Sequence, residues 1–99
     1  MGNLQEIVSE VIRGYAVAGL NGVSYLVQSE DKTVMAVLGV AQVREQHIAD
    51  ASIITRLQDD RVIIEQDKTN KPLVDALVQA GIPREKIVLA YAGETLETV

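Results

Sequence analysis

Apolar residues at the start of the chain recur with the period of a helix. Between positions 4 and 15 they follow one another at steps of three and four, which keeps one helical face apolar: Leu4, Ile7, Val8, Val11, Ile12 and Tyr15. Asn3 can cap this helix, with Glu6 three residues further on. Gly19, Asn21 and Gly22 supply positive φ at little cost, so we expect the helix to end there.

From position 23 the hydrophobic pattern becomes that of strands. The segments VSYLVQ and TVMAVLGV are rich in β-branched residues, and SEDK between them has the composition of a hairpin loop. The next segment alternates, and its predicted apolar face consists of Ala49, Ala51, Ile53, Thr55 and Leu57. Asp59 and Asp60 then form a turn into RVIIEQ, so the sequence predicts a meander of four antiparallel strands.

After the fourth strand the pattern is helical again. Thr69 or Asn70 can cap a helix, Pro72 fits its first turn, and the apolar stripe is Leu73, Val74, Leu77 and Val78. Gly81 favours the left-handed conformation that ends a helix, and Pro83 prevents its continuation. KIVLAY then predicts a final, mostly buried strand, and GETLETV a loose tail.

These elements define one fold class. A chain of 99 residues is large enough for one hydrophobic core and too small for two, so we expect a single domain over residues 1–99. The predicted class is α+β, with two helices, an antiparallel sheet of four to five strands and the element order α-β-β-β-β-α-β.

Composition restricts the chemistry. The chain has no Cys and one His, which excludes thiolate metal sites and the usual zinc constellations, and no cofactor is expected. The formal charge is -5 with Lys and Arg scattered singly, which disfavours tight, direct DNA binding. The N-terminus lacks the pattern of a signal peptide and no apolar run is long enough to span a bilayer, so we expect a cytoplasmic protein without a membrane anchor.

Few residues are candidates for a site. Asp67 and Thr69 form a local polar pair where a strand passes into a helix, yet the same residue types hydrogen-bond the free amides of a helix start, and capping is the favoured interpretation. His47 has no Ser, Cys or second His beside it, so we expect it to be a surface residue. Asp59 and Asp60 have the oxygen ligands of a hard cation, but adjacent carboxylates in a tight turn are usually solvated.

The second half of the chain resembles a known family. Its order of an apolar strand, QDKTN, a short helix and LVQAGIPREKIVLAY is similar to the signature of the XisI family, the fdxN element excision controlling factors. In that family a strand of the form KIWIQ precedes DGTE and a segment LVEAGIPKEDIVLGF. The resemblance is specific over residues 61–91 and extends more faintly over the whole chain.

The resemblance assigns motif residues one by one. Asp67 and Thr69 match the Asp and Thr of DGTE, and Arg61 stands at the family's Lys. The GIP turn is matched by Gly81, Ile82 and Pro83.

Other positions depart from the family pattern. Asn70 replaces its Glu, Ile63 and Val40 replace two Trp, and Ile54 replaces a His. The Pro and Arg that usually follow the last strand are absent from GETLETV. Any activity that needs those side chains is therefore not expected here.

Two functions from different classes follow. The resemblance implies a regulatory, non-enzymatic protein that helps control excision of a DNA element and acts on a protein partner, in the family the nuclease-related XisH. The alternative is a small-molecule-binding or hydrolytic domain with a cleft that uses Asp67 and Thr69, with His47 as a further candidate. A direct DNA-binding factor ranks third.

The sequence also predicts a homodimer. TVMAVLGV is apolar at consecutive positions, which places apolar side chains on both faces of its strand. Two short helices cover only one face of a sheet, and a large bare apolar face is uncommon on a monomer. We therefore expect a second chain to cover the other face.

Overall fold

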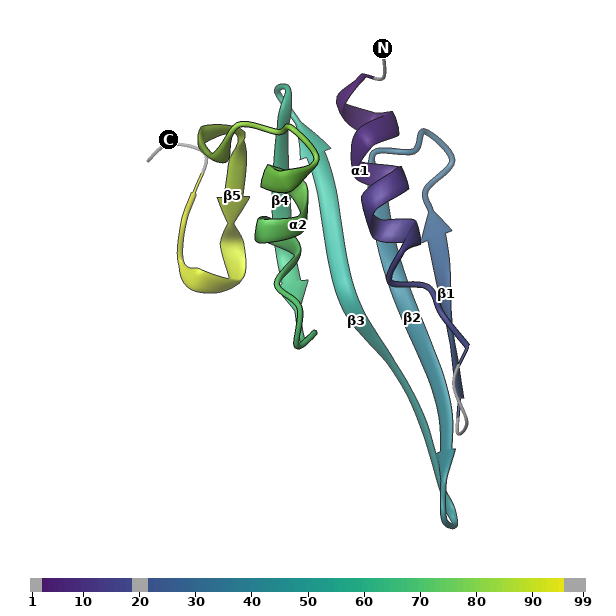
Figure 1. The fold of residues 1–99 in the computed structure, drawn as a ribbon. Coiled ribbons are helices and arrows are strands. Elements are labelled where there is room, and N and C mark those ends of the chain that lie inside the picture. The colour runs from purple at the N-terminus through teal and green to yellow at the C-terminus, as the bar shows by residue number, and fades with distance from the viewer. Residues whose placement is uncertain (1–2, 19–21, 96–99) are drawn as a thin grey trace.

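Two helices and five strands follow one another in the order that the sequence predicts. The computed structural model describes residues 3–18 and 22–95 (Figure 1). The helices and strands are α1 (Leu4–Arg13), β1 (Gly22–Gln28), β2 (Val34–Val43), β3 (Gln46–Gln58), β4 (Arg61–Asp67), α2 (Leu73–Gln79) and β5 (Ile87–Leu89). Two single 3-10 turns, η1 (Arg84–Lys86) and η2 (Ala90–Ala92), flank β5.

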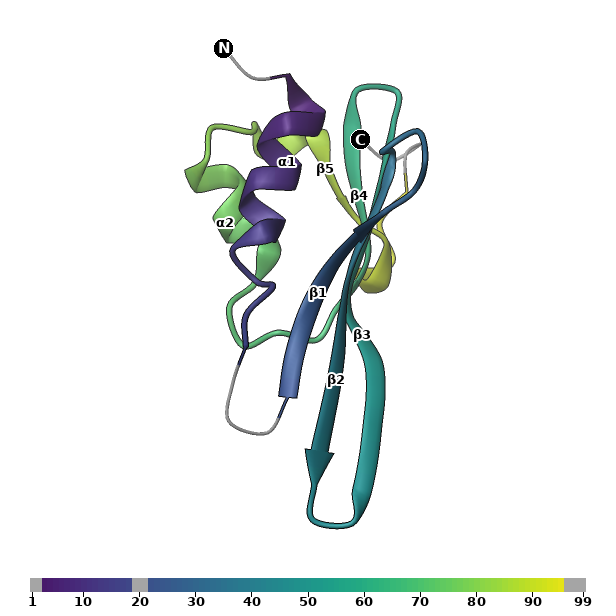
Figure 2. The same ribbon diagram turned by 90° about the vertical axis from the view of Figure 1, so that its right-hand side faces the viewer.

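The sheet keeps the strands in chain order, β1-β2-β3-β4-β5. β1 to β4 form the antiparallel meander that the pattern predicts. β5 pairs with β4 in parallel, because α2 carries the chain back before β5 begins, so the sheet is mixed rather than wholly antiparallel. Both helices lie on one side of the sheet (Figure 2).

α1 begins where the sequence predicts and ends earlier. The Oδ1 atom of Asn3 accepts a hydrogen bond of 2.8 Å from the Glu6 N–H. The helix ends at Arg13, with Gly14 at the C-cap. The expected end at Gly19, Asn21 and Gly22 is wrong for Gly22, which begins β1, while the other two lie outside the described residues. The physical reason is that residues 16–18 already run beside β1, where the Val17 carbonyl accepts from the Ser24 N–H at 2.8 Å.

β3 does not keep the single alternation that its sequence predicts. Ile53 pairs with Val37 of β2, whereas Ala51 pairs with Leu38, so Ser52 is an extra residue that forms a bulge. Because Val37 and Leu38 face opposite sides of the sheet, Ala51 lies on the opposite face from Ile53. The predicted grouping of Ala49 and Ala51 with Ile53 is therefore wrong.

The region around α2 and β5 differs from the prediction in two details. Pro72 stands at the cap position before α2, not inside its first turn. KIVLAY contributes only Ile87–Leu89 as strand, with the residues on either side in 3-10 turns. GETLETV is not wholly loose, because Glu94 accepts from the Leu89 N–H at 2.9 Å and from Arg84 at 3.0 Å. Residues 96–99 of this tail lie outside the described residues.

The core lies between the helices and one face of the sheet. Its buried residues come from α1, α2, four strands and the turn after α2: Val8, Ile12, Met35, Val37, Ile53, Val62, Ile64, Leu73, Leu77, Ile82 and Ile87. The register places the β2, β3 and β4 members of this set on the same face. Burial of these side chains is the main stabilising contribution to the fold.

The opposite face of the sheet is covered only at the edge formed by β4 and β5. Ile63 and Val88 lie on this face and are buried, and η2 packs against β4 at this edge of the sheet (Figure 2). On β1 and β2 the same face is exposed, with Tyr25 53% and Leu38 39% accessible. The sheet therefore presents an apolar surface of its own, separate from the core.

The hairpin of β2 and β3 extends beyond both helices (Figures 1 and 2). All residues from Gln42 to Asp50 are exposed. The turn is made by Arg44 and Glu45, between the pair Val43 and Gln46, and Arg44 has a φ of 57°. This projecting end, residues 42–47, is called the hairpin arm below.

Candidate functional site

Asp67 ends β4 and organises the turn that leads to α2. Its Oδ1 atom accepts from the Thr69 N–H at 2.9 Å and lies 2.6 Å from the Thr69 hydroxyl. Its Oδ2 atom accepts from the Leu73 N–H at 2.7 Å. The Thr69 hydroxyl also lies 2.8 Å from the Lys71 carbonyl. Both carboxylate oxygens are thus engaged by the turn itself.

This arrangement is a cap formed from a distance. Neither Thr69 nor Asn70 caps α2 with its side chain, and Pro72, at the cap position, has no side-chain acceptor. Asp67 instead accepts from the first amide of the helix, at Leu73, six residues further along the chain. The prediction that Thr69 or Asn70 caps the helix is wrong in detail, because the turn places the Asp67 carboxylate closer to the free amide.

Two tyrosines lie near Asp67. Burial raises the pKa of Tyr15, and the charges of Asp67 and Asp75 raise it further. Burial also raises the pKa of Tyr91, again with Asp67 as the next cause. The Tyr15 hydroxyl donates to the Lys71 carbonyl at 2.8 Å, which ties the end of α1 to the start of α2. Both phenols are therefore neutral near pH 7.

The remaining polar candidates lie apart from Asp67. Arg61 is at the opposite end of β4, six residues or about 20 Å along the strand. His47 pairs with Gln42 near the tip of the hairpin arm, also about 20 Å from Ile53, the β3 partner of Asp67. Asn70 is exposed beside Thr69. The structure thus brings Asp67 and Thr69 together and does not bring Arg61 or His47 to them.

The segment Gly81-Ile82-Pro83 closes α2. Gly81 has a φ of 106°, and its N–H donates to the Val78 carbonyl at 3.0 Å. The Ile82 N–H donates to the Leu77 carbonyl at 3.1 Å, which completes the two-bond Schellman arrangement of a helix C-terminus. The Ile82 side chain is 3% exposed and joins the core. Pro83 then precedes η1 and β5.

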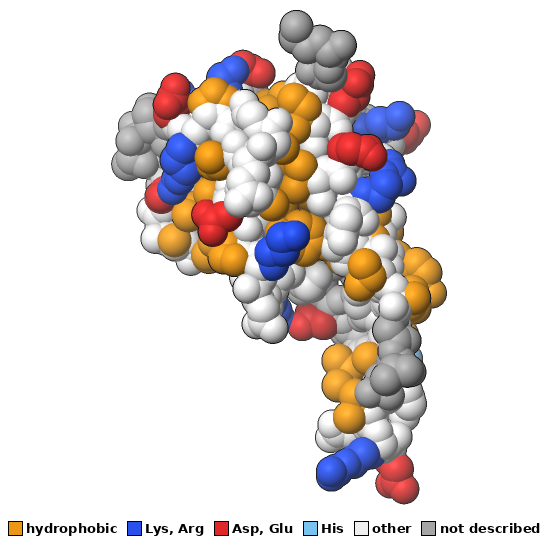
Figure 3. Space-filling view, viewed as in Figure 1, with side chains coloured by type: hydrophobic (Ala, Val, Ile, Leu, Met, Phe, Trp, Pro, Cys, Tyr) orange, Lys and Arg blue, Asp and Glu red, His pale blue; other side chains and the backbone are white. Residues whose placement is uncertain are grey.

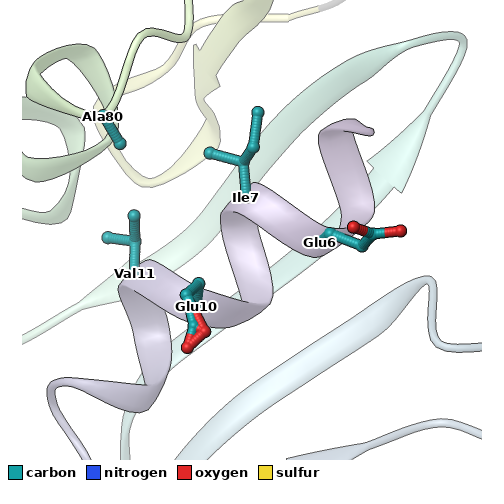
Figure 4. A pocket seen from close by; sticks show the side chains of 5 residues that line it. All are labelled: Glu6, Ile7, Glu10, Val11 and Ala80. Carbon is teal, nitrogen blue, oxygen red and sulfur yellow. The ribbon is translucent and has the colours of Figure 1, made fainter. Parts of the chain in front are cut away.

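A groove lies between α1 and α2, away from the Asp67 turn. It has a volume of about 430 Å³ and is lined by Glu6, Ile7, Glu10, Val11 and Ala80. Figure 4 shows Ile7 and Val11 on the α1 side and Ala80 opposite them on the α2 side, with both glutamates along α1. The space-filling view shows hydrophobic side chains exposed between the two helices (Figure 3). The groove is therefore apolar at its floor and acidic along one rim.

The sequence interpretation did not identify this groove. It assigned Ile7 and Val11 to the apolar face of the first helix, and both side chains are only partly buried. The one feature of the sequence that points to the groove is the spacing of Glu6 and Glu10, which stand one helical turn apart and so place like charges side by side. Ala80 belongs to the far end of another helix, so only the tertiary structure brings it to this groove.

Metal and membrane sites are not evident in the part of the chain that the structure describes. Residues 3–18 and 22–95 contain no group of three or more His, Asp or Glu side chains that could hold a metal ion. Asp59 and Asp60 both have positive φ and form the turn between β3 and β4, and Asp60 is paired with Lys86 at 2.6 Å. No helix among the described residues is long and apolar enough to cross a membrane.

The fold and the groove define a small α+β domain with two helices on one face of a mostly antiparallel five-stranded sheet. The family model described as XisI protein matches residues 1–98, and the chain therefore belongs to the XisI family. The resemblance found in the sequence is thus confirmed, and it covers the first half of the chain as well as the second.

Two solved structures share the fold. A XisI-like protein from Anabaena variabilis is 25% identical, with a TM-score of 0.75 over 86% of this chain and 81% of its own. The fdxN element excision controlling factor XisI from Anabaena variabilis is 20% identical, with a TM-score of 0.68 over 95% of this chain and 92% of its own. No curated protein matches the chain.

Proposed function

We propose that the protein is a regulatory, non-enzymatic accessory factor that helps control excision of a DNA element through contact with a protein partner. Membership of the XisI family over residues 1–98 carries this proposal. One solved structure with the same fold is described as an excision controlling factor, which agrees with it. The partner we propose is an XisH-like, nuclease-related protein.

The hydrogen bonds of Asp67 support a structural rather than a chemical role for the family motif. Its carboxylate accepts hydrogen bonds from Thr69 and Leu73, and neither Arg61 nor His47 is near it. A general base needs a free oxygen within reach of a substrate proton. The cleft near Asp67 and Thr69 that a small-molecule or hydrolytic function requires therefore gains no support from the geometry.

Co-expression tests the partner. The chain, tagged, is produced with an XisH-like protein from the same source, and we expect the two to co-purify in a fixed ratio and to elute together on gel filtration. A chain that elutes alone at micromolar concentration in the presence of that protein would contradict the proposal. If the chain had a hydrolytic activity, and if Asp67→Asn lost that activity while remaining folded, the hydrolytic function at Asp67 and Thr69 would replace the regulatory one.

We also propose that a second copy of the chain covers the bare face of the sheet. The outward residues of β1 and β2 and the middle of β3 form a contiguous uncharged surface, given by the register as Val23, Tyr25, Val27, Val34, Ala36, Leu38, Val40, Ala49, Ala51 and Ile54. Arg56, which pairs with Val34 and forms an ion pair with Glu65, lies at its border. Two chains of charge -5 repel each other, and an uncharged face is where they approach at least cost. A two-fold axis brings identical faces together and closes the assembly.

Sedimentation equilibrium tests the homodimer. We expect twice the 10.7 kDa of one chain at micromolar concentration. Leu38→Lys places a charge on the face and should give monomers, whereas Val78→Lys, at a similarly exposed position on α2, should leave the dimer intact. A monomer for the unmodified chain would show that another partner or no partner takes this face.

A further inference from the structure

The groove between the two helices has an apolar floor that the chain itself does not cover. Ile7 and Val11 lie on the flank of α1 and are only partly buried, although both pack against the core. Ala80, opposite them, is exposed. Its small side chain leaves the space between the helices open (Figure 4). This floor is distinct from the bare face of the sheet, because it lies in the helical layer.

The two glutamates of the acidic rim form no ion pair with the described residues, although Arg13 and Lys32 line a second hollow beside them. Glu6 and Glu10 are exposed and stand one turn apart on α1, where like charges repel each other and destabilise the helix. The ion pairs among residues 3–18 and 22–95 involve Glu65, Asp50, Glu94 and Asp60, and neither rim glutamate takes part in one. Within the described part of the chain, no Lys or Arg lines the groove itself. The rim therefore favours a cation from outside the chain.

The kind of backbone that fits follows from the position of the groove. Its walls are helices, whose backbone groups are already bonded within each helix, so the groove offers no free strand edge. An extended peptide laid there would leave its amides without partners from the protein. A helix satisfies its own amides and needs only side-chain contacts, as in other helix-in-groove complexes.

We infer that the groove receives an amphipathic helix of a protein partner, with an apolar stripe against Ile7, Val11 and Ala80 and Lys or Arg side chains beside Glu6 and Glu10. This inference rests on the proposed function, since it describes how a protein partner is bound. A volume of about 430 Å³ has room for a few apolar side chains of the size of Leu. The contact therefore spans about two turns of the incoming helix.

Peptide binding tests the inference. Two fluorescein-labelled peptides of about 16 residues are compared by anisotropy, one with Leu at helical steps of three and four and Lys elsewhere, the other with Glu in place of each Lys. We expect the unmodified chain to bind the Lys peptide. Glu6→Lys combined with Glu10→Lys should weaken that binding at least tenfold and create binding of the Glu peptide.

Matched variants separate a specific groove from general attraction. Glu30→Lys combined with Glu45→Lys makes the same change in net charge at exposed positions outside the helical layer, and it should change binding less than twofold. Ala80→Tyr fills the groove without changing charge and should also weaken binding at least tenfold. Equal losses in both double variants, or no loss in Ala80→Tyr, would overturn the inference.

Two further outcomes assign the groove elsewhere. Self-association that disappears in the Glu6→Lys and Glu10→Lys variant would give the groove to a second copy of the chain and overturn the helix proposal. An XisH-like protein that binds this variant as well as it binds the unmodified chain would remove the groove from partner binding, while the accessory function itself would stand.

Discussion

Asp67 shows how one side chain connects a motif to a fold. Its carboxylate holds the turn before α2 through the amides of Thr69 and Leu73. Asp67→Ala removes the acceptor for both amides, and we expect the free energy of unfolding to fall by about 2 kcal/mol. Urea melts followed by circular dichroism measure the change. Asp75→Ala, in the first turn of the same helix, serves as the control and should change stability little. An Asp67→Ala protein that melts like its parent but no longer binds its partner would contradict the structural role.

Glu94 gives a residue-scale prediction for pH. A hydrogen bond from the Leu89 N–H, and then Arg84, lower the pKa of Glu94 from its ordinary value of 4.5. A lowered pKa in the folded state adds stability at pH above 4.5 and loses it as the pH falls through the folded-state pKa. Glu94→Gln should therefore be less stable than the parent at pH 7, and the difference should shrink below pH 4. Melts at several pH values measure it, with Glu85→Gln as the control. A difference that grows in acid would contradict the assignment.

Gly22 stands where the backbone of β2 comes close. A Cβ atom there would lie 2.4 Å from the Val40 carbonyl oxygen and 2.8 Å from the Ala41 Cβ, so Gly22→Ala forces the strands apart. We expect a loss of about 1 to 3 kcal/mol in unfolding free energy. Gly39→Ala is the matched control, because its Cβ would meet no atom closer than 3.7 Å. Equal stability of the two variants would show that β1 shifts freely.

At the scale of elements, the hairpin arm lies outside the core. Residues 42–47 are all exposed, and Ala41 pairs with Ile48 just before them. Replacing residues 42–47 by Asn-Gly keeps that pair and supplies a two-residue turn. We expect the free energy of unfolding, measured by urea melts under monomeric conditions, to change by less than about 1 kcal/mol. Ile53→Ala, in the core part of β3, should cost about 3 kcal/mol and sets the scale. A large loss from the shortened arm would mean that the arm packs on the body.

The elements also show what periodicity can and cannot predict. The helical spacing of apolar residues identified α1 and α2, and alternation with turn residues identified the meander. Both patterns could be found because they depend only on residues a few positions apart in the sequence. The bulge at Ser52 and the parallel pairing of β5 were missed, since both depend on partners from other strands. The motif residues Asp67 and Thr69 were found as a pair, but the capped amide at Leu73 and the distance to Arg61 required the fold. The groove was missed for the same reason.

The whole molecule carries a charge of -5, and several of its cations are engaged with its own carboxylates. Arg56, Lys68, Arg84 and Lys86 each form an ion pair with an acidic residue. A DNA backbone needs a concentrated set of free cations to release its counterions. We therefore expect no sequence-specific binding of duplex DNA by the isolated chain at physiological salt. A mobility-shift titration that reveals selective binding below micromolar concentration would contradict this expectation.

The order of the strands in the sheet has a consequence for folding. Because β1 to β5 lie side by side in chain order, each strand can join a neighbour that the ribosome has already released. Contacts between consecutive strands close short loops, which favours rapid folding. α1 is the exception, since it leaves the ribosome before the strands but buries its apolar residues in a core that those strands complete. Its apolar face is therefore uncovered during early synthesis, and this is the stage at which a chaperone would meet the chain.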